Sequence, residues 1–283
     1  MSETVTDLQT LNNARLRAFV LPREHGAWGI LLVPLVTGAT VALLRGGALL
    51  PVMLFLLAAI SLFCLRTPVE AALGTAPQRI DNPAERRVVM CAVAGYSVVA
   101  CMALAVLLWN GNHPGLLMLG AIAAASFGAQ TLLRRLGRKT RMLSQIVGLA
   151  GLTSTATGAY YVSTGRLDAT AWMIWAANWL FAANQVHMVQ LRIHNAKVAG
   201  FRQRLARGWK FLTGEILTVA LLVAFFYLRL LPKMSVIAFH PMLLRGAAWF
   251  FKKPRPLRIH RLGWMELGFA LIFGVMFVSG FLR

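Results

Sequence analysis

Charged residues are scarce in this sequence, and acidic residues are the scarcest of them. Only 13% of the 283 residues are charged, and nine are Asp or Glu against 29 Lys or Arg. A soluble chain carries about one quarter charged residues, so this composition excludes an ordinary soluble domain. The shortage of carboxylates also argues against an enzyme that needs clustered acidic residues to hold a hard metal cation.

Cysteine is also scarce, and no metal-binding spacing surrounds it. Cys64, Cys91 and Cys101 lie in or beside apolar segments, without a CxxC or Cys/His pattern. We interpret them as small apolar core residues and predict neither a metal site nor a cofactor. The N-terminus lacks the short apolar core and the small-residue cleavage site of a signal peptide, so we expect the first apolar segment to stay in the protein.

Long apolar blocks are what the chain has in abundance. Hydrophobic residues make up 58% of the sequence, in blocks of roughly 17–25 residues that match a hydrocarbon core about 30 Å thick. The ~10-residue alternating segments of an outer-membrane barrel are not visible. We predict an all-α, polytopic transmembrane bundle over residues 23–283, preceded by a polar cytoplasmic segment over 1–22. The nine expected spans are residues 28–44, 48–65, 88–109, 115–133, 142–162, 170–191, 213–231, 235–251 and 264–282.

Basic residues are distributed unequally between alternate loops. With the N-terminus inside, 23 of the 29 Lys and Arg residues fall in cytoplasmic segments, five lie on the outer side or at the outer end of a span, and Arg245 lies inside the eighth span. Cytoplasmic loops collect positive charge, which favours a membrane protein with a cytoplasmic N-terminus and an external C-terminus. The same charge predicts contact with membrane lipid. Basic residues in short loops, without a binding module, argue against nucleic acid.

Small residues recur at helical spacing in two of the expected spans. Gly120, Ala124 and Gly128 are four residues apart in the fourth span, and Gly151 and Thr155 are four apart in the fifth. Faces of this kind let helix backbones approach closely. We predict that both spans pack tightly against neighbouring helices.

Most of the acidic residues lie at the expected cytoplasmic ends of spans or in the loops that join them. Ionisable groups near membrane depth usually face a cavity or a partner. One interpretation is a polar cytoplasmic vestibule, and the plainer one is that each carboxylate pairs with a nearby arginine. Arg66 and Glu70, for example, are four residues apart and can pair on a helix. The six acidic residues are Glu24, Glu70, Asp81, Glu85, Glu215 and Glu266.

The run "PREHGAWG" places Arg23, Glu24 and His25 directly before the first span. Arg23 alone fits an interfacial anchor. Glu24 suits a helix N-terminus, and His25 belongs to the residue type that titrates near neutral pH. Because an anchor does not explain Glu24 and His25 together, we predict that they form the rim of a cavity.

Polar residues also run through the sixth expected span. Asn184, His187, Gln190 and His194 follow a helical repeat and form one stripe, which should face the bundle interior. His187 and His194 are about 10.5 Å apart along a helix axis, too far to share a metal ion. We therefore predict one cytoplasmic-side cavity for a small anionic or isoprenoid ligand. Its candidate lining residues are Arg23, Glu24, His25, Arg66, Glu70, Asn184, His187, Gln190, Arg192 and His194.

The segment "LPREHGAWGILLVPLVTGA" resembles the YwiC-like family of bacterial membrane proteins, which implies a multispanning membrane protein. The span order, with large inner loops after spans two and six, also resembles UbiA-type prenyltransferases, whose Asp-rich motifs hold Mg²⁺ and a prenyl diphosphate. Here those places read "RTPVEAALGTAPQRIDNPAERR" and "NQVHMVQLRIHNAKVAG", without such motifs. We assign no catalytic residue. The open functions are a binder or transporter of a small anionic or lipid-like ligand, a divergent UbiA-like enzyme, and a structural membrane subunit.

Overall fold

Helices form the regular structure of the chain. The computed structural model describes residues 15–22, 25–74, 76, 78–111, 114–137, 140–196, 198, 200–251 and 259–282. Within these ranges every regular element is helical, which confirms the predicted all-α class. The chain divides into two compact units, one of residues 1–27 and 50–113 and one of residues 28–49 and 114–283. The predicted single transmembrane domain over 23–283 stays a prediction.

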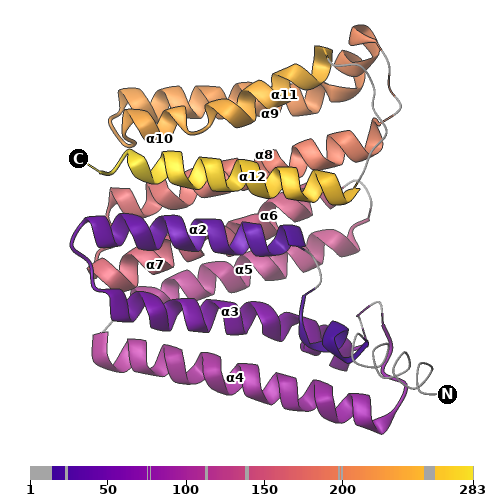
Figure 1. Ribbon diagram of the computed structural model, residues 1–283, viewed down its shortest axis with the longest axis vertical. Helices are drawn as coiled ribbons and strands as arrows, with labels where there is room; N and C mark the ends of the chain where they lie inside the picture. The colour runs from indigo at the N-terminus through magenta and orange to yellow at the C-terminus, as the bar shows by residue number, and fades with distance from the viewer. Residues whose placement is uncertain are drawn as a thin grey trace, which may run out of the picture. The chain divides into compact units, whose positions relative to one another are not determined.

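The first unit contains two long helices, α3 (Leu49–Ala72) and α4 (Pro83–Gly111) (Figure 1). We expected the span of α3 to end at residue 65. Instead α3 continues through Pro68 to Ala72. Long apolar helices tolerate an internal proline where the freed backbone groups find other partners.

An ion-pair network holds the helical segment over residues 15–20 in the first unit. Nε of Arg15 lies 2.7 Å from Oε1 of Glu85, and the same guanidinium also pairs with Asp81. The hydrogen bond to Asp81 is the main reason that the pKa of Arg15 is raised above its ordinary value. In the same unit, Phe19 packs into a small core with Ala71 and Val89. Asp81 and Glu85 are thus paired with an arginine, as the plainer interpretation predicts.

The second unit holds the remaining helices (Figure 1). From Trp28 onward α2 belongs to it. α9 begins at residue 201, although we expected its span to begin at 213, so basic residues assigned to a loop lie on its first turns. The elements are α2 (His25–Leu44), α5 (Gly115–Arg135), α6 (Arg141–Thr153), α7 (Thr155–Thr164), α8 (Ala169–His194), α9 (Phe201–Tyr227), α10 (Lys233–Ile237), α11 (His240–Phe251) and α12 (Ile259–Ser279).

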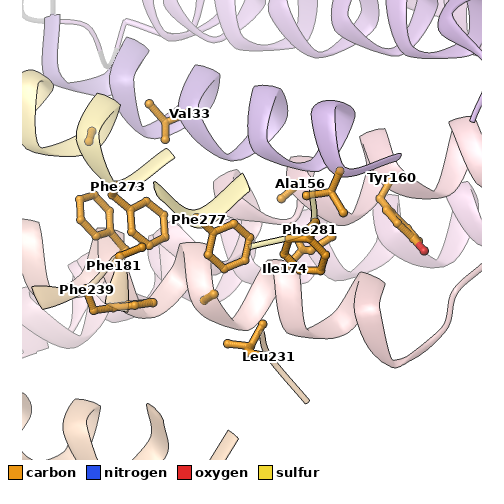
Figure 2. Packing of buried hydrophobic residues seen from close by; sticks show 14 of the residues in the cluster. Val33, Ala156, Tyr160, Ile174, Phe181, Leu231, Phe239, Phe273, Phe277 and Phe281 are labelled. Carbon is orange, nitrogen blue, oxygen red and sulfur yellow. The ribbon is translucent and has the colours of Figure 1, made fainter. Parts of the chain in front are cut away.

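Aromatic rings form the core of the second unit. Phe181 on α8 stacks on Phe273 on α12, with ring centroids 4.0 Å apart, and Phe239 meets Phe273 edge-on at 5.0 Å. Phe277 and Phe281 continue this row towards the C-terminus, as Figure 2 shows. Phe273 and Phe277 are four residues apart on α12, so they project from one helix face. This face joins α12 to α8 and to the segment between α10 and α11.

Three successive hydroxyl residues interrupt the expected fifth span. Thr153, Ser154 and Thr155 each donate a side-chain hydrogen bond of 2.7–2.8 Å to a backbone carbonyl three or four residues earlier. Such bonds compete with the helix for its acceptors. At this run of hydroxyl residues α6 ends at Thr153 and α7 begins at Thr155. Ser154 itself keeps helical backbone angles, with φ −61° and ψ −16°, so the interruption is local.

The expected eighth span is also divided. α10 ends at Ile237 and α11 begins at His240. Pro241 has no N–H, and its ring would clash with the carbonyl of Ile237 in a continuous helix. Pro34, by contrast, lies inside α2 without dividing it. Pro241 therefore coincides with a helix break and Pro34 does not.

Close packing between α5 and α6 uses a different face from the predicted one. A Cβ atom built on Gly120 or Gly128 meets nothing within 4 Å, so these glycines mark no helix contact among the described residues. A Cβ on Gly151 would instead lie 3.2 Å from both Ala123 O and Ser126 Cβ. The four-residue spacing of small residues thus identified a packing face on α6. On α5 it did not, because Gly120 and Gly128 do not lie at a helix contact within the described ranges.

Seven helical segments within the described ranges are long and apolar enough to cross a membrane, whereas we predicted nine spans. α6 and α7 are each too short because of the break at Ser154. α8 has 26 residues, but its amide side chains lower its mean hydropathy. The seven are Gly26–Leu44, Leu49–Ala72, Pro83–Trp109, Gly115–Arg135, Phe201–Tyr227, Lys233–Phe251 and His260–Ser279.

Candidate functional site: a buried charged cluster

Polar side chains from four helices meet inside the second unit, where α9 packs against α8 and α11, and α11 packs against α12. Nδ2 of Asn184 on α8 donates to Oε1 of Glu215 on α9 at 3.2 Å. Both residues are buried, with 7% and 6% of their surface exposed. The Glu215 carboxylate packs directly on Gly246 of α11, where a Cβ atom would overlap it. Gly246 therefore supplies the space that this carboxylate occupies.

An ion pair between α11 and α12 lies beside this carboxylate. One terminal nitrogen of Arg245 is 2.6 Å from Oε2 of Glu266, and the two side chains are 8% and 12% exposed. The Arg245 guanidinium also lies over the Phe269 ring, 4.5 Å from its centroid, which is a cation–π geometry. Gln185 on α8 donates to the backbone carbonyl of Glu266 at 2.8 Å. The positive charge of Arg245 also acts electrostatically on the Glu215 carboxylate.

Several buried atoms of this cluster have no hydrogen-bond partner in the described part of the chain. They are Oδ1 of Asn184, Nε and Nη2 of Arg245, and Oε1 of Glu266. Native proteins keep few such atoms, because each costs about 1–3 kcal/mol. Arg192, which is half-buried, interacts electrostatically with Glu266 and Arg245. The cluster therefore contains two arginines and two glutamates, and it retains free donors and acceptors.

The rest of the predicted stripe on α8 has mixed surroundings. The His187 ring lies against α9, edge-on to Phe211 with centroids 5.2 Å apart. Gln190 is half-buried, and His194 is exposed with its Nδ1 2.8 Å from the carbonyl of Gln190. Only Asn184 and Arg192 of the predicted α8 residues belong to the charged cluster. Within the described ranges no group of three or more His, Cys, Asp or Glu residues is placed to hold a metal ion.

The other predicted lining residues belong to the first unit. Arg23 and Glu24 lie outside the described residues, as does the side chain of His25, whose backbone begins α2. Arg66 Nε donates to Glu70 Oε1 at 2.8 Å, which confirms the predicted pairing one turn along α3. The convergence of these residues with the α8 stripe around one cavity stays a prediction.

The sequence alone does not reveal that Arg245, Glu215 and Glu266 share one site. The available signal was Arg245 itself, because a charge within an apolar span needs a partner. Two acidic residues on the neighbouring spans were the candidates, but nothing in their spacing identifies which of them pairs. Gln185 lies off the predicted stripe and carried no signal.

Seven helical segments of spanning length in the described ranges, and a charged cluster buried in the second unit, indicate an integral membrane protein with multiple α-helical spans. Residues 21–161 match the model of the family described as YwiC-like protein. The chain is also similar to Uncharacterized protein YwiC from Bacillus subtilis (strain 168), with 25% identity over 254 residues that cover 90% of this chain and 95% of that protein. The family match ends within α7, so every residue of the charged cluster lies beyond it.

Proposed function

We propose that this protein is a YwiC-like protein of the bacterial cytoplasmic membrane that binds a small anionic ligand at the charged cluster. The observation that carries the proposal is the state of Arg245. Its side chain is 8% exposed, yet it uses one N–H on Glu266, and its Nε and Nη2 are buried without a hydrogen-bond partner among the described residues. An oxyanion would accept these donors in charge-assisted hydrogen bonds, which are the strong kind.

Neighbouring residues support an anionic ligand of limited size. Arg192 adds a second positive charge from α8, and its partial exposure offers a route to the cluster. Asn184 adds an amide group whose Oδ1 has no hydrogen-bond partner in the part of the chain that the structure describes. Glu266 pairs with Arg245 when no ligand is bound. When the ligand enters, Glu266 competes with the ligand for the Arg245 guanidinium. This competition favours a ligand that releases readily, which suits a binder or a transporter.

The proposed topology has nine spans with a cytoplasmic N-terminus. α8 is 26 residues long, about 39 Å at 1.5 Å per residue, which exceeds the ~30 Å hydrocarbon core. α6 and α7 follow one another across a single residue with helical angles and together also reach that length. Adding these two spans leaves 23 of the 29 basic residues on one side, as the positive-inside rule requires.

This topology places the charged cluster in the cytoplasmic half of the membrane. Asn184 is ten residues from the end of α8, about 15 Å along the axis. Glu266 is seven residues after the start of α12, about 10 Å. A ligand would therefore reach the cluster from the cytoplasm. The likeness to UbiA-type prenyltransferases stays a prediction, and no contact described here favours it.

Thermal unfolding of the purified protein in detergent micelles tests the proposal. Ligand that binds only the folded state raises Tm in proportion to RT ln(1 + [L]/Kd). We expect at least one anion among phosphate, sulfate, acetate and citrate, added as sodium salts at equal ionic strength, to raise Tm. Arg245→Gln should abolish the shift. Glu266→Gln should increase it, because the competing carboxylate is removed. Arg207→Gln, at an exposed position of α9, should leave it unchanged.

Two results would contradict anion binding at the cluster. One is a Tm shift that survives in the Arg245→Gln variant. The other is the absence of a shift in both the parent protein and Glu266→Gln. The second result would favour a structural membrane subunit, in which the cluster only holds α8, α9, α11 and α12 together.

A further inference from the structure

A second polar site lies at the opposite end of the same unit. A cavity of about 610 Å³ opens between the end of α2, the start of α8, the end of α9 and the C-terminal segment. Thr170 in its wall is fourteen residues before Asn184 on α8, which is about 21 Å along the axis. The cavity is therefore separate from the charged cluster. Its wall includes Arg45, Thr170, Phe226, Tyr227, Arg229 and Phe281.

Two arginines give this cavity a positive lining. Arg45 lies 5.7 Å from the centroid of the Phe281 ring and interacts with the Tyr160 hydroxyl. The nearby Asp168 is engaged elsewhere, because it caps α8 through Ala171 N and accepts from Tyr160. Neither arginine forms an ion pair within the described part of the chain, and no carboxylate lines the cavity. Neither guanidinium is therefore neutralised by a carboxylate among the described residues, and both can bind an anion.

The backbone at Arg229 is strained. Its φ is 55°, and it is the single residue other than glycine in the described ranges with a positive φ. This left-handed conformation costs a side chain roughly 1–2 kcal/mol, and glycine adopts it readily. Its N–H bonds to the carbonyl of Phe226 at 3.0 Å, which holds the turn. The cavity wall therefore contains an arginine at a position where glycine would make the folded protein more stable.

Exposed apolar side chains at the end of α9 line or adjoin the cavity. Tyr227 is 77% exposed and Leu228 is 68% exposed, and Phe226 beside them is 42% exposed. Exposed aromatic residues at the end of a spanning helix are typical of the membrane interface. A free inorganic anion would not contact this apolar surface, whereas the acyl chains of a lipid would pack against it.

We propose that this cavity binds the phosphate headgroup of an anionic phospholipid, with Arg45 and Arg229 as its contacts and the lipid chains against the end of α9. In the nine-span topology this is a lipid of the outer leaflet. The site is independent of the proposed anion site at the charged cluster, because it shares no residue with it.

The test measures Tm of delipidated protein in micelles with added dioleoyl phosphatidylglycerol, dioleoyl phosphatidylcholine or inorganic phosphate. We expect a saturable rise with phosphatidylglycerol and a much smaller one with phosphatidylcholine, which has the same chains. Arg229→Gly keeps the backbone conformation, so without lipid it should be at least as stable as the parent protein. Its affinity for phosphatidylglycerol should fall about tenfold, the value of one lost charge-assisted contact. Arg45→Gln should likewise lower the affinity for phosphatidylglycerol about tenfold.

Arg166→Gln serves as the matched control, since Arg166 is exposed on a loop of the same unit and lies outside the cavity wall. This variant should bind phosphatidylglycerol like the parent protein. Equal responses to the two lipids, or an unchanged affinity in both Arg229→Gly and Arg45→Gln, would overturn the proposal. A full response to inorganic phosphate alone would overturn its assignment to a lipid.

Discussion

Removing one partner of the buried Arg245–Glu266 pair should destabilise the protein strongly. Arg245→Met would leave the Glu266 carboxylate 12% exposed, with Oε1 already unpartnered. Breaking a buried pair from one side costs about 3–5 kcal/mol, because an uncompensated charge stays behind. Little solvent reaches either side chain to screen it. We expect a loss of this size in the free energy of unfolding for Arg245→Met, and a similar loss for Glu266→Met.

The double variant Arg245→Met/Glu266→Met should recover most of that loss. Replacing a buried ion pair by apolar residues of similar volume is often neutral or stabilising. The coupling energy from the double-mutant cycle is the sum of the two single losses minus the loss of the double variant, so it should exceed the loss of either single variant, about 3–5 kcal/mol. Equilibrium unfolding in mixed micelles, followed by circular dichroism, measures all four proteins.

The chain contains a matched control for this cycle. Arg66 and Glu70 form a pair at 2.8 Å, but their side chains are 37% and 36% exposed. Exposed pairs four residues apart on a helix are worth about 0.3–0.5 kcal/mol. The same cycle with Arg66→Met and Glu70→Met should give a coupling energy of this size. If the Arg245 cycle gives an equally small coupling, the reasoning from burial is wrong.

Three further changes test other contacts by thermal or denaturant unfolding. Gly246→Ala should displace the Glu215 carboxylate from its hydrogen bond and lower the free energy of unfolding by about 1–3 kcal/mol. Gly38→Ala should cost about 3 kcal/mol, because its Cβ would overlap the α7 backbone, which cannot rotate away as a side chain can. Gly268→Ala, where a Cβ meets nothing within 4 Å, is the control for both and should be neutral or stabilising; equal results for Gly38→Ala and Gly268→Ala would refute the close approach. Asp168→Ala should lose about 1 kcal/mol with the cap of α8, and Asp168→Asn should retain most of it.

Much of the helical organisation follows from the sequence because it depends on local patterns. Each of the nine apolar segments that we predicted contains helix in the structure, since block length and helical propensity act within one stretch of chain. The pairing of Arg66 with Glu70 also follows, because four residues separate neighbours on a helix. The division of the fifth span at Ser154 does not follow in the same way. Serine and threonine hydroxyls bond either to their own helix or to another one, and only the packing decides between these.

The charged cluster is a product of tertiary structure. Asn184 and Glu215 are 31 residues apart, and Arg245 and Glu266 are 21 residues apart, on different helices. Arg15 likewise reaches Asp81 across 66 residues. Composition, span length and the placement of basic residues determined that this is a polytopic helical membrane protein. Helix packing decided which buried charges form pairs. A pair between two helices depends on the rotation of each helix and on its position along the membrane normal, and the spacing of residues along one helix determines neither.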